Sequence, residues 1–438
     1  MVNQKTIKSY ISLLILALIV IVPLFILYTD VPFSRSFYPW PVLFSTLGKL
    51  SGLLGLSIFS LALLMSARFV WLDKLFYGLP KVINIHRWLG TISFTFIILH
   101  PLFLAASRLS VSNQAAFGIF TNWSQTAYLF GYISLLVFMA LVLMTFFWRL
   151  QYEKLKSLHS ILAVPLMIGG VHALLIDSDI KSIPLLAIYY ILLISISVLL
   201  YLVRLFLVGY AIKSRRFVVS KVEQLGTSIV SITFQPDKKI IDVKPGQFIF
   251  VSFPDIKKGE EHPFSVAQIY PDHSLTIMAK NLGAYTAKLA KLKVGSVAVL
   301  DGPYGSFGDN LDLNYHQIWL AGGIGITPFV SLAQSLGVKK TGAGVVDLFY
   351  IVTSEKDLVA LDIFQQAQTT YPQFKLNIYI SDKEGRFDLE KLGKFVADIR
   401  ACHFYICGPV GMMSALTSAL LRTGIPKKNI NPEAFKML

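Results

Sequence analysis

Four histidines lie in the strongly apolar first half of the chain: His86, His100, His159 and His172. An ionisable side chain is costly inside a lipid bilayer, and where one occurs it usually serves a function. Neutral imidazole binds metals, and two imidazoles can fill both axial positions of a haem iron used for electron transfer. These residue types therefore indicate metal or proton chemistry within a membrane.

The four histidines form two pairs with similar spacing. His86 and His100 share the apolar segment 82–106, and His159 and His172 share the segment 155–176. Both segments are expected to be helices that start on the same side of the membrane, which places His86 level with His159 and His100 level with His172. A rise of about 1.5 Å per residue separates the two levels by roughly 20 Å. That arrangement predicts two stacked b-type haems, each held by one histidine from each helix.

Helical phase favours this interpretation for the first segment. The fourteen residues from His86 to His100, at about 100° each, leave the two side chains within about 40° of one another. Gly90 and Ser93 fall on the same face. Both are small enough to let a flat macrocycle approach the backbone.

The phase is less favourable on the second segment. The thirteen residues from His159 to His172 leave an offset of about 140°. Pro165 lies between the two histidines and is expected to bend the helix, and Gly169 and Gly170 are expected to loosen it. Two other interpretations stay open: histidines that hydrogen-bond within a helical core, and a proton relay.

The composition supports a membrane location. Hydrophobic residues make up 54% of the 438 residues and charged residues only 15%, with a mean hydropathy of +0.61. Soluble domains carry about 25% charged residues, so part of this chain is expected in lipid. The net charge of +15 comes from scattered basic residues. Because they form no single stripe, a nucleic-acid partner is not expected.

Six apolar segments are long enough to cross a bilayer. They span residues 7–28, 42–65, 82–106, 126–148, 155–176 and 183–210, and they predict an integral, multi-pass membrane domain over residues 1–212. The first segment exceeds the apolar core of a signal peptide, and no small-x-small cleavage site follows it. It is therefore expected to stay as a membrane helix, so the domain is an all-α six-helix bundle.

The charges between the apolar segments predict the orientation. One side carries Lys5, Lys8, Arg68, Lys74, Lys81, Arg149, Lys154, Lys156, Lys213, Arg215 and Arg216. The other side carries Arg35, Lys49, Arg108 and Lys181 together with Asp30, Asp177 and Asp179. An excess of Lys and Arg marks the cytosolic side. Both termini are thus expected in the cytosol, and the plasma (inner) membrane is the expected location.

The hydrophobic pattern of the sequence changes after Arg216, where the long apolar runs end. Short alternating strands follow, among them residues 217–219, 229–234, 247–252 and 275–279. They predict an antiparallel β-barrel over residues 213–313. From about Tyr315 strands alternate with helices, which predicts a doubly wound α/β nucleotide-binding domain over residues 314–438.

The predicted barrel carries two motifs that suit a flavin. In His262-Pro263-Phe264-Ser265, the aromatic ring can pack on the flavin while the hydroxyl bonds its polar edge. Residues 280–286 join a strand to a helix start. Free backbone N–H groups there, with Lys280 and Thr286, would suit a pyrophosphate. Each motif alone could instead be an ordinary strand exit or helix cap.

The α/β region carries two motifs that suit a dinucleotide. Residues 321–328, Ala-Gly-Gly-Ile-Gly-Ile-Thr-Pro, follow an apolar strand and open a helix. Glycines in such a turn allow a phosphate to approach the backbone. Cys407-Gly408-Pro409 ends another strand at the same edge of the sheet, where ligands bind in open α/β folds. The two cysteines, Cys402 and Cys407, have the spacing of neither a metal pair nor a redox motif, and no disulfide is expected.

A further motif, Asp301-Gly302-Pro303-Tyr304-Gly305, lies between the flavin motifs and the dinucleotide motifs. The motifs, in this order along the chain, resemble those of the ferredoxin-NADP reductase module. Joined to six apolar spans with paired histidines, they make the chain similar to the NADPH oxidase and ferric reductase family from about residue 40 onward. The resemblance implies that FAD contacts His262, Pro263, Phe264, Ser265, Lys280, Gly283 and Thr286. It implies that the nicotinamide nucleotide contacts Gly323, Gly325, Thr327, Pro328, Cys407, Gly408 and Pro409. Ser265, Cys407 and Phe435, which resembles an aromatic that covers the flavin in such modules, are the expected catalytic residues.

The resemblance implies a transmembrane NAD(P)H oxidase. Electrons would pass from NADPH through FAD and two haems to an extracytoplasmic acceptor, and oxygen, giving superoxide, is the expected one. Animal oxidases of this family have a further histidine one turn beyond the outer ligand, where this chain has Leu104. A ferric-chelate reductase, a haem partner that feeds another membrane or periplasmic protein, and a proton or ion pathway therefore stay open.

NADPH is expected to be preferred over NADH. The 2′-phosphate needs cationic or hydroxyl partners beyond the strands that follow the glycine turn. Lys383 and Arg386, after the strand 377–380, are the expected partners. Glu355 or Asp382 could instead bind the ribose hydroxyls of NADH, so dual specificity stays open.

Overall fold

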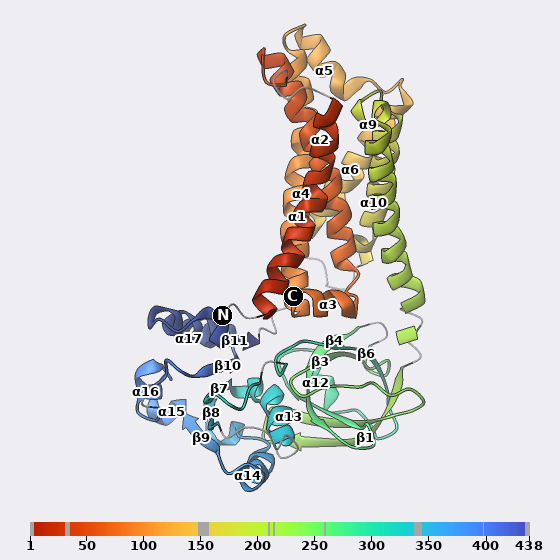
Figure 1. Ribbon diagram of the computed structural model, residues 1–438. Coiled ribbons are helices and arrows are strands. Elements are labelled where there is room, and N and C mark those ends of the chain that lie inside the picture. Colours follow the sequence, from red (N-terminus) through yellow and green to blue (C-terminus); the bar gives the residue numbers. More distant parts are fainter. Residues whose placement is uncertain are drawn as a thin grey trace. The chain divides into compact units, whose positions relative to one another are not determined.

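The computed structural model describes residues 4–30, 36–147, 157–208, 211–212, 215–257, 260–309, 311–336, 344–396 and 398–433 (Figure 1). The chain divides into two compact units. One consists of residues 7–76 and 81–208, and the other consists mainly of the chain from residue 209 onward. Each unit is described by itself.

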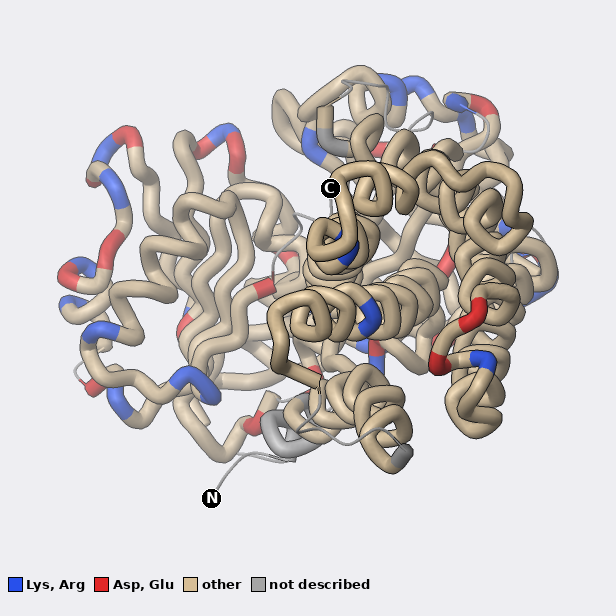
Figure 2. Tube along the Cα trace, turned by 90° about the horizontal axis from the view of Figure 1, so that it is seen from above, with Lys and Arg blue, Asp and Glu red and all other residues tan. Residues whose placement is uncertain are grey.

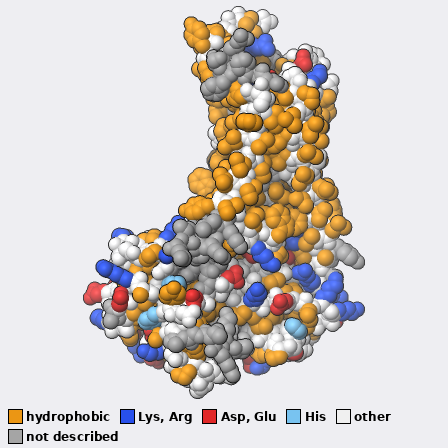
Figure 3. Space-filling model, viewed as in Figure 1, with side chains coloured by type: hydrophobic (Ala, Val, Ile, Leu, Met, Phe, Trp, Pro, Cys, Tyr) orange, Lys and Arg blue, Asp and Glu red, His pale blue; other side chains and the backbone are white. Residues whose placement is uncertain are grey.

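The first unit is a bundle of long apolar helices. Its elements are α1 (Gln4–Asp30), α2 (Trp40–Ser66), α3 (Val70–Phe76), α4 (Leu79–Arg108), α5 (Asn113–Thr121), α6 (Thr126–Phe147), η2 (Ser160–Leu162), α8 (Ala163–Leu175), α9 (Asp179–Ser182), α10 (Pro184–Val203) and η3 (Arg204–Val208). Six of the described segments are long and apolar enough to cross a membrane, as predicted. Their outward side chains are apolar, as the space-filling view shows (Figure 3).

Helix α2 is the most buried of these six segments. Gly48, Gly52 and Gly55 lie one helical turn apart and face α4, where an added Cβ would come within 3.0 Å of Leu104, His100 and Ile97. Small residues at this spacing let two membrane helices approach closely. On another face of α2, the hydroxyl of Tyr190 from α10 donates to the Leu53 carbonyl at 2.8 Å. These contacts fix α2 between α4 and α10.

The second unit begins with a closed six-stranded antiparallel barrel. Its strands are β1 (Arg216–Leu225), β2 (Ile229–Pro236), β3 (Phe248–Ser252), β4 (His262–Ile269), β5 (Leu275–Lys280) and β6 (Val297–Tyr304), in the order β1-β2-β5-β4-β3-β6, with α12 (Thr286–Leu289) between β5 and β6. Alternate side chains point inward and form one apolar core around Phe217, Phe234 and Phe264. The charged positions lie mainly in loops (Figure 2). The predicted barrel is confirmed.

A five-stranded parallel sheet follows. Its elements are β7 (Gln317–Gly322), η4 (Gly323–Ile326), α13 (Thr327–Leu336), β8 (Val346–Val352), η5 (Glu355–Asp357), α14 (Leu361–Thr370), β9 (Phe374–Ile380), α15 (Ser381–Glu384), α16 (Leu389–Gly393), β10 (His403–Cys407), α17 (Val410–Arg422), η6 (Lys427–Asn429) and β11 (Ile430–Glu433). Two apolar clusters, one including α13 and α14 and the other including α16 and α17, lie on either side of it. The doubly wound fold is confirmed.

The strand order β11-β10-β7-β8-β9 reverses direction between β7 and β10. In open α/β sheets, ligands bind outside the carboxyl ends of the strands at such a reversal. Helix α13, which starts there, also ties the sheet to the barrel. Its Gln334 side chain bonds the N–H and the carbonyl of Ile269 in β4 at 3.1 and 3.2 Å, and Ser331 accepts from the Gly246 N–H at 2.9 Å.

Candidate functional site

The four membrane histidines meet in the two predicted pairs. The ring centroids of His86 and His159 lie 5.8 Å apart, and those of His100 and His172 lie 6.5 Å apart. Two metal–nitrogen bonds of about 2 Å, plus roughly 1 Å from each nitrogen to its ring centre, place axial imidazoles about 6 Å apart. Each pair therefore has the spacing needed to bind one metal ion between its two imidazoles.

Hydrogen bonds fix the tautomer of three of these rings. The Nδ1 atoms of His86, His100 and His172 lie 2.7 to 2.8 Å from the carbonyl oxygens of Ala62, Gly48 and Ala127. A carbonyl only accepts, so Nδ1 carries the proton and Nε2 keeps its lone pair. Metal-bound histidines commonly donate their other N–H to a backbone carbonyl in this way. The fourth ring, His159, has a longer contact of 3.4 Å from Nδ1 to the Thr145 hydroxyl.

Glycines leave space around the His100/His172 pair. A Cβ at Gly52 would lie 2.7 Å from Nδ1 of His100, and one at Gly131 would lie 2.8 Å from Nδ1 of His172. Any larger residue at either position would push the imidazole away. Gly90, between the two histidines of α4, has no atom within 4 Å of its would-be Cβ, which fits the predicted approach of a macrocycle.

Helix phase on the second segment is corrected by a feature that the sequence did not reveal. His159 precedes the 3₁₀ turn Ser160–Leu162, and α8 starts only at Ala163. A 3₁₀ turn advances about 120° per residue where an α-helix advances about 100°, so three such residues recover about 60° of the offset. Gly169 and Gly170, which were expected to loosen the helix, serve helix packing in the structure. These residues give close contact with Ser134 of α6 and Ile194 of α10.

Within the described residues, no three His, Cys, Asp or Glu side chains come together to hold a metal ion. The paired imidazoles are therefore the metal-binding arrangement that the described part of the chain offers. A pair of neutral nitrogen ligands suits the iron of a haem, whose other four ligands come from the porphyrin.

The predicted flavin strand is β4. His262 is partly exposed, bonds Glu260 at 2.8 Å and packs on Tyr285, with ring centroids 4.0 Å apart. Burial disfavours ionised Glu260, but hydrogen bonds from Lys257 and His262 outweigh it and lower the Glu260 pKa. The Ser265 side chain is almost buried, and its hydroxyl has no hydrogen-bond partner within the described part of the chain. It is thus available to a ligand.

Three residues of the flavin motifs, Phe264, Leu282 and Gly283, make contacts within the protein. The Phe264 ring packs within the barrel core, because alternation along β4 points it inward. In the loop before α12, the N–H groups of Leu282 and Gly283 donate to the Thr286 hydroxyl at 2.9 and 3.1 Å. Those two donors are therefore not free for a pyrophosphate, in contrast to the expectation. Lys280 lies 4.0 Å from Asp357 of η5.

The glycine turn after β7 and the end of β10 meet at the point where the strand order reverses. A Cβ at Gly325 would lie 2.5 Å from the Cys407 carbonyl oxygen, and one at Gly408 would lie 2.9 Å from the Cα of Gly322. Gly323 adopts a φ of +52°, and its would-be Cβ has no atom within 4 Å. Thr327 and Pro328 open α13, and Pro409 precedes α17. The backbones of the two motifs thus lie against one another, and binding of the nicotinamide nucleotide there stays a prediction.

Cys407 is fully buried at this place. Burial, with a further contribution from Glu433, raises the pKa of its thiol well above the usual range. Cys407 is therefore a neutral thiol here. Glu433, at the end of β11, was not found from the sequence because its position depends on strand pairing with β10. Phe435 lies outside the described residues.

The two cations expected to bind the 2′-phosphate differ. Lys383 forms an exposed ion pair with Glu355 at 2.6 Å, and this pairing raises the Lys383 pKa and lowers the Glu355 pKa. Arg386 is exposed, and its guanidinium has no ion-pair partner within the described residues. Of the two, only Arg386 has its charge uncompensated.

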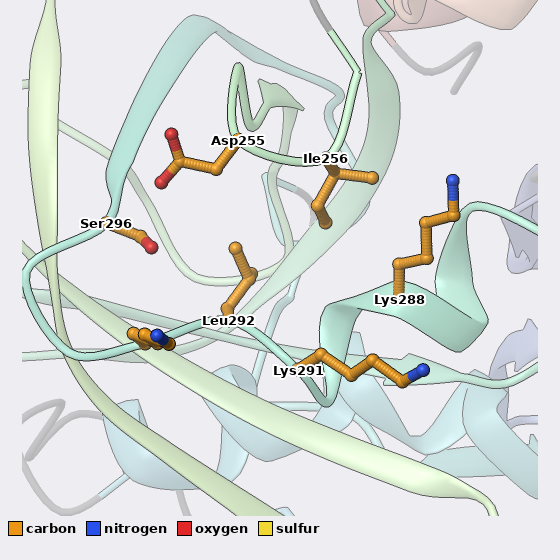
Figure 4. Close-up of a pocket in the computed structure, with 7 residues that line it drawn as sticks. Asp255, Ile256, Lys288, Lys291, Leu292 and Ser296 are labelled. Atoms are coloured by element: carbon orange, nitrogen blue, oxygen red, sulfur yellow. The ribbon is translucent and has the colours of Figure 1, made fainter.

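A separate hollow of about 500 Å³ lies on the barrel (Figure 4). It is lined by Asp255, Ile256, Lys288, Lys291, Leu292, Lys293 and Ser296. The Lys288 and Lys291 side chains point away from Asp255 and Ser296, as Figure 4 shows. The lysines do not converge on one point, so the hollow has no geometry for a single anion.

Three family models match the chain. The ferric reductase like transmembrane component matches residues 51–170, the FAD-binding domain matches residues 214–308, and the oxidoreductase NAD-binding domain matches residues 319–418. The first match includes His86, His100 and His159 and ends two residues before His172. The second includes both flavin motifs, and the third includes the glycine turn and the Cys407 motif.

Curated relatives match about half of the chain. Flavohemoprotein A of Dictyostelium discoideum is 27% identical over 242 residues, which cover 51% of this chain and 60% of that protein. The flavohemoprotein of Rhizobium meliloti is 27% identical over 245 residues, 50% of this chain and 60% of that protein. The chain thus spans less than two thirds of the length of these relatives. The crystal structure of flavohemoglobin from Malassezia yamatoensis, with bound FAD and heme, has a TM-score of 0.47 at 19% identity and covers 75% of this chain and 88% of that one.

Proposed function

Because the chain has the three-domain architecture of the NADPH oxidase and ferric reductase family, we propose that it passes electrons from NADPH through FAD and two haems to an acceptor across the membrane. The main support for this proposal is that the imidazoles lie in two pairs, His86/His159 and His100/His172, each with the spacing of two ligands on one metal ion. Three of these four rings also make the backbone hydrogen bond typical of a metal ligand.

The residues of the second unit bind and orient the donors. When bound, FAD turns the two electrons of a hydride into single-electron transfers, which haem can carry. The unpaired Ser265 hydroxyl is the proposed partner of the polar edge of the flavin. The proposed binding site of the nicotinamide nucleotide is formed by the close-packed backbones of Gly322, Gly325 and Gly408. Cys407, as a neutral thiol, contributes packing there and no charge.

The proposed orientation places NAD(P)H and both termini in the cytosol. It rests on the excess of Lys and Arg in the loops on that side of the apolar segments. The plasma (inner) membrane is the proposed location. The outer histidine pair, His100/His172, then delivers electrons to the opposite side.

Oxygen is the proposed acceptor, with superoxide as the product. Two imidazoles on one iron leave no open position, so an acceptor would take its electron at the porphyrin edge. A ferric chelate is the second candidate, and Leu104 favours it. Leu104 packs against Gly48, where an added Cβ would lie 2.7 Å from its side chain, and so places an apolar group one turn beyond His100.

The acceptor can be tested with the full-length protein loaded with FAD and haem. In air with NADPH, superoxide is expected at two per NADPH, because a hydride carries two electrons. A ferric chelate should be tested in parallel without oxygen. Chelate reduction with no superoxide in air would overturn the oxygen proposal in favour of the chelate. Haem reduction with neither product would instead support a haem partner for another protein.

A preference for NADPH over NADH is expected from the loop after β9. Arg386→Ala should raise KM for NADPH about tenfold, since a charge-assisted bond to the phosphate is lost, and leave KM for NADH nearly unchanged. Lys383→Ala should have a smaller effect, because Lys383 already pairs with Glu355. The measurement is kcat/KM for both cofactors. Equal use of the two by the wild type, or no selective loss in Arg386→Ala, would contradict this assignment.

A further inference from the structure

Lys391, on α16, reaches back to the loop that follows β9. Its ammonium donates to the Tyr379 hydroxyl, to the Glu384 carbonyl at 2.6 Å and to the Arg386 carbonyl at 2.7 Å. An ammonium group has three donors, and all three are used here. Bonds from a charged donor are stronger than those between neutral groups. One side chain therefore fixes two carbonyls of the same loop.

The loop is shaped so that these carbonyls face Lys391. It consists of the single turn α15 (Ser381–Glu384), then Gly385 with a φ of +74°, then Arg386. A φ in this region favours glycine and reverses the chain direction. Tyr379 supports the same shape, since its hydroxyl donates to the Glu384 carbonyl at 2.8 Å. The start of α16 is itself capped, because Asp388 accepts from the backbone N–H of Lys391 at 3.0 Å.

The loop lies at the carboxyl edge of the sheet. A nucleotide with its pyrophosphate at the glycine turn after β7 would extend along this edge toward β8 and β9. The loop carries Arg386, the cation whose charge no described residue compensates. Lys391 holds the backbone carbonyl of that same residue. The ammonium cannot both keep these three bonds and turn toward a ligand.

We propose that Lys391 is a positioning residue for NADPH recognition: it holds the loop 381–386 in the shape that presents Arg386 to the 2′-phosphate. This inference rests on the proposed NADPH function. Lys391 does not touch the nucleotide. Its effect on the cofactor is exerted through the backbone of Arg386.

The test uses the full-length protein with Lys391→Met, which keeps the aliphatic stem and removes the three donors. KM for NADPH is expected to rise about tenfold, while kcat and KM for NADH stay within about twofold. Trypsin should also cleave faster after Lys383 and Arg386, because the loop is released. The matched control is Lys394→Met, an exposed lysine at the end of the same helix, which should change neither quantity.

The outcomes separate this inference from the cofactor assignment. Equal rises in both KM values, or no rise in either, would overturn the positioning role even where Arg386→Ala selectively loses NADPH. If Arg386→Ala leaves KM for NADPH unchanged, the assignment of Arg386 to the 2′-phosphate fails. Separately, unchanged trypsin cleavage in Lys391→Met would overturn the proposal that Lys391 holds the loop. If Lys391→Met does not retain FAD, Tyr379→Phe removes one acceptor and should raise KM for NADPH about two- to threefold. An unchanged KM in that variant would count against the proposal.

Discussion

Replacing His100 with leucine is expected to remove the outer haem and to stop electron delivery across the membrane. The His100 and His172 rings lie 6.5 Å apart, so the loss of one leaves the iron with a single protein ligand. Changing even the partner of a metal-bound histidine costs about 10- to 100-fold in metal affinity, so losing the ligand itself should reduce outer-side activity at least ~100-fold. Haem content should fall from two per chain to one, measured by the absorbance of the dithionite-reduced protein.

The matched control for this variant is Leu102→Ala, a half-exposed apolar residue two positions further along α4. It should keep both haems. NADPH oxidation with a soluble acceptor for the flavin should stay within about twofold of the wild type in both variants, because the second unit is untouched. Full two-haem content in His100→Leu would show that the outer ligand has been assigned wrongly.

Gly325→Ala is expected to block reduction of the flavin by NADPH. The new methyl group would lie 2.5 Å from the Cys407 carbonyl oxygen and 2.6 Å from the Cα of Gly408. Both neighbours are backbone atoms, so the turn after β7 must move away from the end of β10. A displacement of about 1 Å in a site that orients a substrate can cost on the order of 100-fold in rate. The measurement is the rate of flavin reduction in a rapid-mixing experiment with NADPH.

Gly411→Ala is the control for this change. Gly411 lies in the nearby helix α17, and its would-be Cβ has no atom within 4 Å, so the rate should stay within about twofold. FAD content and the melting temperature should be measured for both variants, since a misfolded chain would lose the flavin as well. A Gly325→Ala protein that keeps its FAD and the wild-type rate would refute the role of this close contact.

The parts that the sequence predicted well are those with a local signal. Long apolar runs predict membrane helices because backbone and side chains must both be satisfied in lipid, and the six segments are found within a few residues. Alternation predicts the barrel strands, and the glycine turn predicts the start of α13. The histidine pairs were also predictable, because matched depth on two helices restricts which rings can meet.

The parts that the sequence could not predict depend on partners far away in the chain. Gly131 matters because His172 packs on it, and Glu433 matters because β11 pairs with β10. Neither partner is visible from local spacing. The 3₁₀ turn at Ser160–Leu162 was also not predicted from the sequence, because its residues fit an α-helix equally well. The burial of Phe264 in the barrel core was also not visible from the sequence, because the inside-outside register of a strand is settled only when the barrel closes.

The backbone acceptors behind the histidines bear on the speed of the proposed electron transfer. Ala62 and Gly48 of α2 hold the rings of α4, and Ala127 of α6 holds His172. A carbonyl built into a helix cannot rotate away or exchange for water, as a side chain can. If the proposed haems bind here, ligands held in this way would keep their positions when the charge on the metal changes, so the reorganisation energy would be small and electron transfer fast. His159 relies on the longer contact to Thr145, a side chain, so the His86/His159 pair is held less rigidly than the His100/His172 pair.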